Sequence, residues 1–164
     1  MIEQTLVLIK PDGVKRALIG KVISRFEDAG FKIAGMKMQW IDEDFAKKHY
    51  TKEDIAKRHG DKIWKTMLKY ILEGPVIAIV LEGDRAVEVV RKIVGSTFPN
   101  EALPGTIRGD FAHISREHAN SKDMQVYNVI HASANSQDAK KEVPLWFTKK
   151  ELHSYKTAHE MMMF

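Results

Sequence analysis

The strongest constraint on the fold is the alternation of short apolar runs with segments of helical periodicity. The apolar runs cover residues 5–9, 31–41, 76–81 and 126–131. Apolar residues recur at helical spacing between them, as in Ile19, Val22, Ile23 and Phe26, and later in Ala86, Val87, Val90, Ile93 and Val94. The order strand, helix, strand, helices, strand, helix, strand predicts an α+β fold. We expect a ferredoxin-like antiparallel sheet of four strands, with helices packed on one of its faces.

Capping residues and chain breakers set the limits of the early helices. Gly30 can close the first helix, and Asp42 can cap a short helix that reaches Tyr50. A longer helical segment is predicted from about residue 53 to residue 72, ended by Gly74 and the proline after it.

The second strand and the C-terminal third carry less regular signals. The apolar positions change parity near Gly35, which predicts a β-bulge or burial on both faces. Residues 95–124 show little periodicity, and irregular segments of this length are usually functional or flexible. A short helix is predicted from about residue 138 to residue 142, and residues 148–151 form a capping box for one more.

Composition narrows the class of protein. The 164 residues, 44% of them hydrophobic, suffice for one domain that we expect to span residues 1–164. The absence of cysteine excludes disulfides, a thiol nucleophile and cysteine-based metal sites, and it fits a reducing cytoplasm. The N-terminus lacks the pattern of a signal peptide, and no apolar run reaches the roughly 18 residues of a membrane span. The net charge of +4 is spread along the chain, so no dedicated nucleic-acid surface is expected.

A strand-end lysine and a glycine-rich segment are candidates for binding phosphate. Lys10 ends the first apolar run, where it can aim its charge into a cleft, although a solvated strand end is the plainer interpretation. Residues 104–110 place Arg108 between two glycines, which allow a ligand to approach the backbone closely; a surface turn is the alternative. Together with Arg91 and Thr97, Arg108 would supply two guanidinium groups and a hydroxyl to a di- or triphosphate. The sequence contains neither a P-loop nor a Gly-x-Gly-x-x-Gly motif.

His131 is the candidate nucleophile, although a lone histidine at a strand end is more often structural. Strand alternation would place Asn128 with Ile130 on one face and His131 on the other. Glu142 follows eleven residues later and could orient one imidazole nitrogen while the other attacks. Most of the other six histidines are predicted to lie on the surface: His49, His59, His113, His118, His153 and His159.

Four segments, taken together, resemble the motifs of the nucleoside diphosphate kinase family. They are Thr-Leu-Val-Leu-Ile-Lys-Pro-Asp-Gly-Val at 5–14, Gly-Pro-Val-Ile-Ala at 74–78, Pro-Gly-Thr-Ile-Arg-Gly-Asp-Phe at 104–111 and Asn-Val-Ile-His-Ala-Ser at 128–133. They occur in the order typical of that family, and the similarity runs over nearly the whole chain. Any one of these motifs would be a weak signal, but four in register explain the candidate residues jointly.

The resemblance implies a Mg²⁺-dependent ping-pong reaction with broad base specificity. His131 would attack the terminal phosphorus through Nδ1, and Glu142 and Ser133 would hold the ring. Contacts to the phosphoryl groups and the ribose would come from Lys10, Tyr50, Arg91, Thr97, Arg108 and Asn128. Magnesium would bridge the phosphates rather than sit in a carboxylate cage. A homo-hexamer is suggested, with a tetramer possible.

The chain departs from the family pattern where the base would bind. The segment after Tyr50 is longer than in the shorter members, and counting places Ile63 at the base-stacking position with Trp64 next to it. Trp64 is favoured as an aromatic platform, with Ile63 as an apolar alternative. The segment between Asp110 and Asn128 is also longer, and Ala134 stands where an aspartate is common, so Asn135 or Ser136 would cap the next helix.

Two other functions fit parts of the sequence. One is a ferredoxin-like module that binds nucleotide or nucleic acid without catalysis, and the other is a histidine phosphocarrier that passes phosphate to a protein. The first would be expected to lose His131, which is present. The second would not need two arginines and an asparagine arranged for a nucleotide.

Overall fold

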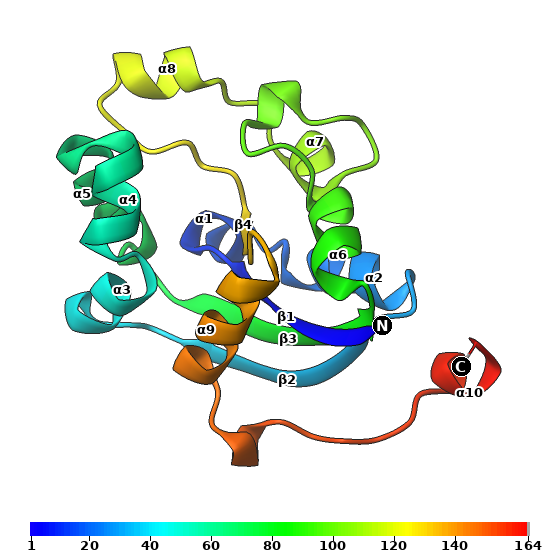
Figure 1. The fold of residues 1–164 in the computed structure, drawn as a ribbon. Coiled ribbons are helices and arrows are strands. Elements are labelled where there is room, and N and C mark those ends of the chain that lie inside the picture. Colours follow the sequence, from blue (N-terminus) through cyan, green and yellow to red (C-terminus); the bar gives the residue numbers. More distant parts are fainter. Residues whose placement is uncertain (164) are drawn as a thin grey trace.

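A four-stranded antiparallel sheet forms the centre of the molecule. The computed structural model describes residues 1–163, and its strands are β1 (Ile2–Ile9), β2 (Lys32–Gln39), β3 (Val76–Asp84) and β4 (Ile130–Ala132). Their order across the sheet is β2-β3-β1-β4, which is the ferredoxin-like arrangement predicted from the sequence (Figure 1). The run at 76–81 is continuously apolar, which is typical of a central strand, and β3 does pair on both of its edges.

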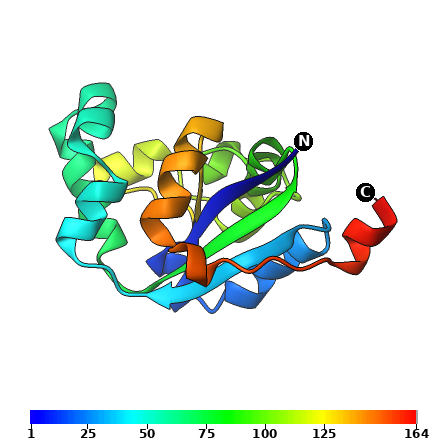
Figure 2. The same ribbon diagram turned by 60° about the horizontal axis from the view of Figure 1, so that its bottom comes forward.

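Helices cover both faces of this sheet, so the prediction that they pack on one face is wrong. Helices α2 (Ile19–Glu27), α6 (Ala86–Val94) and α7 (Ile107–Phe111) pack on the face to which β1 contributes Val7 and Ile9. Helices α3 (Glu43–His49), α5 (Asp61–Ile71) and α9 (Ser136–Trp146) pack on the face that carries Leu6 and Leu8 (Figure 2). The physical reason lies in β1, where four consecutive apolar residues are fully buried and each face therefore needs a cover.

The long helical segment predicted from residue 53 to residue 72 is two helices. Gly60 separates α4 (Lys52–His59) from α5, and its φ of 88° is one that a residue with a side chain rarely adopts. Residues 95–124 also contain more structure than their pattern indicated. The 3-10 helix η1 (Pro99–Glu101) and the short helices α7 and α8 (Arg116–Ser121) interrupt the irregular backbone.

The remaining elements are three short helices and an extended segment near the C-terminus. Helix α1 (Pro11–Lys15) follows β1 directly, and the 3-10 helix η2 (Lys149–Glu151) follows α9 and has the predicted capping box. The chain then runs along the free edge of β2, where the His153 N–H donates to the Ala34 carbonyl over 2.7 Å. It ends in α10 (Ala158–Met163) (Figure 1). The bond from His153 to Ala34 falls at the predicted bulge, which interrupts the pairing of β2 with β3 between Ile33 and Gly35. Among the described residues, no helix has the length and apolar character needed to cross a membrane.

Candidate active site

A strained turn just before β4 sets the geometry of the site. Val129 has a φ of 69°, and the Ile130 N–H donates to the Asn128 carbonyl over 2.7 Å, which closes a γ-turn. The strand predicted over 126–131 is therefore shortened to β4, and strand alternation does not relate Asn128 to His131. Such a conformation in a β-branched residue is costly and persists only where neighbouring contacts impose it.

Asp12 is one such contact, and it was not among the predicted site residues. Its buried carboxylate accepts a hydrogen bond from the Val129 N–H at 3.1 Å and another from the Tyr70 hydroxyl at 2.5 Å. The Tyr70 ring stacks on Tyr127 with a centroid distance of 4.8 Å. The Val129 carbonyl accepts in turn from the backbone N–H of Lys10 at 2.8 Å. The N–H and the carbonyl of Val129 are thus both held by hydrogen bonds. In the sequence, the only sign that Asp12 would hold this turn was its place in the motif at 5–14.

His131, Glu142 and Ser133 form one hydrogen-bonded group. Glu142 lies on α9, which extends past the predicted limit and is capped by Asn135, one of the two expected caps. One oxygen of Glu142 lies 3.1 Å from His131 Nε2, and the other accepts from the Ser133 hydroxyl at 2.5 Å. Burial alone would raise the pKa of Glu142, but the His131 ring and these hydrogen bonds outweigh it and lower the pKa to about 2. An ionised carboxylate accepts the Nε2 proton, which leaves the Nδ1 lone pair of His131 free to attack.

Lys10 is buried at the end of β1 rather than solvated. Its Nζ donates to the side-chain oxygen of Asn128 over 2.8 Å and lies 5.0 Å from the centre of the Tyr70 ring. Burial, and next the positive charge of Arg108, lower the pKa of Lys10 to about 7. An anionic ligand beside Nζ would restore full protonation, so the group is suited to meet a phosphate.

Arg108 is also buried and is braced by main-chain carbonyls. Its guanidinium donates to the carbonyls of Gly95 at 3.1 Å, Ile130 at 2.6 Å and Asn128 at 3.3 Å. Burial, followed by the charge of Arg91, lowers the pKa of Arg108 to about 10, so the group stays charged. The Asn128 amide donates to the Thr97 carbonyl at 2.8 Å. The structure therefore brings Arg108 and Asn128 together with the main chain of Thr97. The side chains of Arg91 and Thr97 remain exposed.

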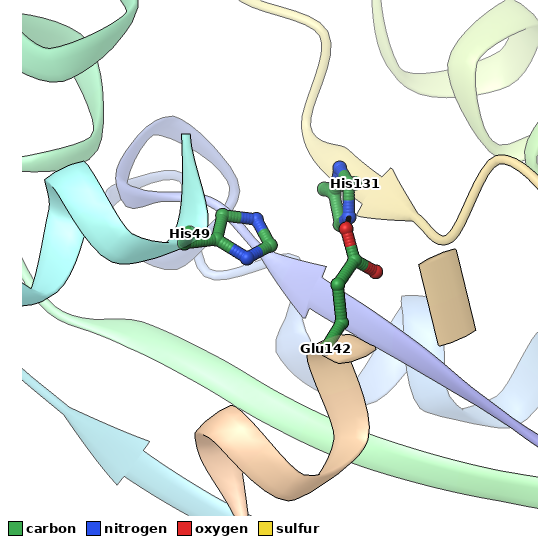
Figure 3. Close-up of side chains that lie close together, drawn as sticks. All are labelled: His49, His131 and Glu142. Carbon is green, nitrogen blue, oxygen red and sulfur yellow. Dashed lines mark hydrogen bonds and ion pairs between the residues drawn. The ribbon is translucent and has the colours of Figure 1, made fainter. Parts of the chain in front are cut away.

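His49 and Tyr50 approach the same histidine from the end of α3. The His49 ring lies 4.8 Å from the His131 ring and nearly perpendicular to it (Figure 3). The Tyr50 ring is buried and lies 6.1 Å from that of His131. Burial, followed by the charge of Glu142, raises the pKa of the Tyr50 hydroxyl, which therefore stays protonated. The prediction that most other histidines are on the surface holds for five of them and is wrong for His49.

A cavity of about 390 Å³ opens beyond Asn128, between helices α4, α5 and α8. Ile63, Phe98 and Asn128 line it, and so do residues of the longer segment around α8, such as Gln125. Trp64 does not face this cavity. Its indole packs against the core on the α3 face of the sheet and donates to the Tyr50 carbonyl at 2.8 Å, so the preference for Trp64 as the platform is not supported.

A second cavity of about 330 Å³ lies beside His131, between α4 and α9. Glu142 and Tyr50 line it, and it shares Ile55 and Arg58 with the first cavity. The two cavities therefore adjoin at Ile55 and Arg58, and together they are called the cleft, with His131 at one end and Ile63 at the other.

Comparison with known proteins identifies close relatives of this chain. The sequence model of the family described as "Nucleoside diphosphate kinase" matches residues 3–152. Nucleoside diphosphate kinase from Borreliella burgdorferi is 49% identical over 160 residues, covering 98% of this chain and 96% of the relative. The enzyme of the same name from Pyrococcus horikoshii is 49% identical over 157 residues, with 95% and 92% covered.

Solved structures agree with this similarity. A structure described as a transition-state mimic of nucleoside-diphosphate kinase from Borrelia burgdorferi, with bound vanadate and ADP, has a TM-score of 0.96 and 48% identity. It covers 98% of this chain and 96% of its own. An NDP kinase from Pyrobaculum aerophilum has a TM-score of 0.86 and 34% identity, with 94% and 100% covered.

Proposed function

Because the chain belongs to the nucleoside diphosphate kinase family, we propose that the residues gathered around His131 carry out the reaction of that family. The protein transfers the terminal phosphoryl group of a nucleoside triphosphate to a nucleoside diphosphate through a phosphohistidine. The observation that carries the assignment of residues is the His131–Glu142 pair, which engages Nε2 and leaves Nδ1 free on a histidine that lines a cavity.

The reaction has two balanced halves at this one nitrogen. In the first half, the lone pair of His131 Nδ1 forms a bond to the terminal phosphorus, and the bond from phosphorus to the bridging oxygen breaks. That oxygen leaves with its electron pair as part of the nucleoside diphosphate. In the second half, a terminal oxygen of the second diphosphate attacks the same phosphorus, and the phosphorus–nitrogen bond returns its electrons to Nδ1. One site therefore serves both nucleotides in turn.

The other residues position the ring and neutralise charge. Glu142 and Ser133 keep the His131 ring in the tautomer whose Nδ1 is unprotonated. Lys10 and the Tyr50 hydroxyl would contact the transferring phosphoryl group, whose equatorial oxygens carry the charge of the transition state. Further contacts would come from Arg91, Thr97 and Arg108 to the remaining phosphates, and from Asn128 to the ribose.

Magnesium fits this site as a partner of the nucleotide. Two acidic side chains close to the candidate residues are already engaged: Asp12 by Tyr70 and Val129, and Glu142 by His131 and Ser133. Oxygen ligands for Mg²⁺ would therefore come from the phosphates and from water, as is common for this ion. When bound, the ion would neutralise phosphate charge. The protein would contribute Lys10 and Arg108 beside it.

The base would lie in the cavity beyond Asn128. Ile63 is the better candidate for the apolar contact, because it lines that cavity and Trp64 does not. Contact through an apolar surface and the faces of the base is tolerant of base identity, which agrees with broad specificity. The segment around α8 would form the opposite wall.

Assembly and location complete the proposal. We expect a homo-oligomer, because Met36 and Met38 of β2 and the following Trp40 present a largely exposed apolar strip. Resemblance to the family suggests a hexamer, with a tetramer as the alternative. A cytoplasmic location agrees with the nucleotide substrates and with the absence of cysteine.

A labelling experiment tests this assignment directly. The protein is incubated with Mg²⁺ and ATP labelled at the γ-phosphate, and unlabelled GDP is then added. We expect acid-labile, alkali-stable label on the wild-type protein that moves to GDP. His131→Ala should carry none, whereas His153→Ala, which alters an exposed histidine, should behave as wild type. No label on the wild type would contradict the proposal, as would full transfer by His131→Ala. Stable label that GDP does not remove would favour a phosphocarrier.

A further inference from the structure

A buried nitrogen of His49 has no role in the reaction described above. His49 is the last residue of α3, and its Nε2 atom is buried without a hydrogen-bond partner among the described residues. Buried polar atoms nearly always find a partner, so one that lacks a partner beside a nucleophile calls for an explanation.

Trp146 determines which nitrogen of His49 carries the proton. An indole N–H can only donate, and Nε1 of Trp146 lies 3.2 Å from His49 Nδ1. Nδ1 must therefore offer its lone pair, and the proton of the neutral ring resides on Nε2. Trp146 is 2% exposed and packs edge-on against Phe45, so its indole is held in place. Burial, and next the neighbouring His131, lower the pKa of His49 to about 3, which keeps the ring neutral at physiological pH.

The same tautomer argues against a metal ion at this point. His49, His131 and Glu142 have potential ligand atoms within 4.8 Å of one another. A metal would need a free lone pair from each ring. The lone pair of His49 accepts from Trp146, and its other nitrogen is protonated, so the free Nε2–H group is suited to donate a hydrogen bond and not to bind a cation.

Within residues 1–163, no acceptor lies at hydrogen-bond distance from the Nε2 atom of His49. The nearby carboxylate of Glu142 is directed at other groups, with one oxygen at His131 and the other at Ser133. The rings of His49 and His131 lie 4.8 Å apart and nearly perpendicular, and the three side chains converge from α3, β4 and α9 (Figure 3). A phosphoryl group on Nδ1 of His131 would bring three strong acceptor oxygens into the space between these elements.

We propose that His49 is a further catalytic residue, which donates a hydrogen bond from Nε2–H to an oxygen of the phosphoryl group while that group resides on His131. The inference rests on the proposed function. An uncharged donor orients the phosphoryl group without adding another positive charge to those of Lys10 and Arg108. It thereby supports the intermediate and still permits the second transfer, in which the phosphorus–nitrogen bond must break.

The first test uses the wild-type protein, so it does not depend on the folding of a variant. The imidazole N–H proton of His49 is observed by NMR in ¹⁵N-histidine-labelled protein, before and after phosphorylation by ATP and Mg²⁺. We expect the proton on Nε2 before phosphorylation and a downfield shift of its signal afterwards. A signal that does not move, or a proton found on Nδ1, would overturn the inference. Absence of phosphohistidine on the wild type would instead refute the proposed function, and the inference with it.

The second test separates donation from packing. His49→Phe keeps an aromatic ring but removes the N–H, whereas His49→Gln keeps a donor on a smaller side chain. We expect His49→Phe to lower the single-turnover rate of phosphorylation by about 10-fold, the loss typical of one hydrogen bond to a charged oxygen. His49→Gln should recover most of that rate, and KM for ATP should change by less than about twofold in both variants.

The exposed His153 provides the matched control. His153→Phe should react as wild type, because its side chain lies far from His131 at the edge of β2. A wild-type rate for His49→Phe would contradict the inference. So would equal losses in His49→Phe and His49→Gln, because a purely structural role does not distinguish a variant with a donor from one without.

Discussion

The two ends of the cleft are built on different principles. The three residues proposed to contact phosphate and ribose, Lys10, Asn128 and Arg108, are buried, and each is held by hydrogen bonds. At the base end, Ile63 and Gln125 are half-buried, and the ion pair that links α5 to the segment after α8, Lys62–Asp123, is largely exposed. The comparison indicates that this fold prearranges the residues proposed to act on phosphate and leaves more adaptable the cavity proposed to receive the base.

This difference predicts that substitutions at the phosphate end lower the rate or the stability, whereas substitutions at the base end change substrate binding.

The largest effect is expected for Lys10→Met, which keeps the length of the side chain and removes the charge. The value of kcat/KM should fall by about 10²- to 10³-fold, as for the loss of one donor to a transition-state oxygen. Steady-state kinetics with ATP and GDP measures it. Lys15→Met, at an exposed position on α1, is the control and should be neutral; a loss below about 10-fold for Lys10→Met would break the comparison.

Asp12→Ala should produce the next largest effect, on stability. The substitution leaves the Tyr70 hydroxyl and the Val129 N–H without their acceptor, and each unsatisfied buried group costs about 1–3 kcal/mol. We expect the free energy of unfolding to fall by about 2–4 kcal/mol, measured by urea denaturation. Asp28→Ala, an exposed position at the end of α2, should stay within about 0.5 kcal/mol of wild type. Similar values for both variants would show that the turn at Val129 is not held by Asp12.

Glu142→Gln should lower turnover by about 10- to 100-fold, because it removes a charged hydrogen-bond acceptor of His131. The substitution also has a pH signature. The folded-state pKa of Glu142 is lowered to about 2, so its carboxylate contributes stability above the unfolded pKa of 4.5, and this contribution is lost as the pH falls from there towards 2. The difference in unfolding free energy between wild type and variant should therefore be constant above about pH 5 and decrease below it.

Glu151→Gln is the matched control for that measurement. The pKa of Glu151 is also lowered to about 2, by Lys37 first and then by Thr148, but Glu151 lies in η2 away from the cleft. Its removal should change the acid dependence of stability in the same direction without changing turnover. Full activity of Glu142→Gln would show that the carboxylate does not act on His131.

The smallest effect is expected at the base end. Ile63→Ala should raise KM by about 3- to 10-fold, similarly for ATP, GTP and CTP, because it removes apolar contact without disturbing the phosphates. The value of kcat should stay within about twofold. Trp64→Phe is the comparison: it should lower stability by removing the bond to the Tyr50 carbonyl and leave KM unchanged. A strong preference of Ile63→Ala for one base, or a larger KM effect at Trp64, would reverse the assignment.

Much of the fold could be predicted because local patterns and strand order agree. The apolar run at 76–81 indicated an interior strand, and Asp42 and Asn135 do cap the helices predicted to follow them. The predicted limits of helices and strands are wrong where a single residue or a tertiary contact overrides the local propensity. Gly60 divides a continuous helical pattern, and the γ-turn at Val129 ends β4 early, which no periodicity indicates.

The sequence by itself predicted the ferredoxin-like sheet of four strands and membership of the family, because these follow from local patterns and from motif resemblance. It also supplied the proposal that His131, in the motif at 128–133, is the nucleophile. Only the tertiary structure decided that Lys10 is buried against Asn128, that Trp64 turns away from the cavity, and that Trp146 fixes the tautomer of His49. These properties depend on contacts between residues far apart in the chain. Burial, protonation and side-chain direction are set by such neighbours, and a pattern read along one chain does not contain them.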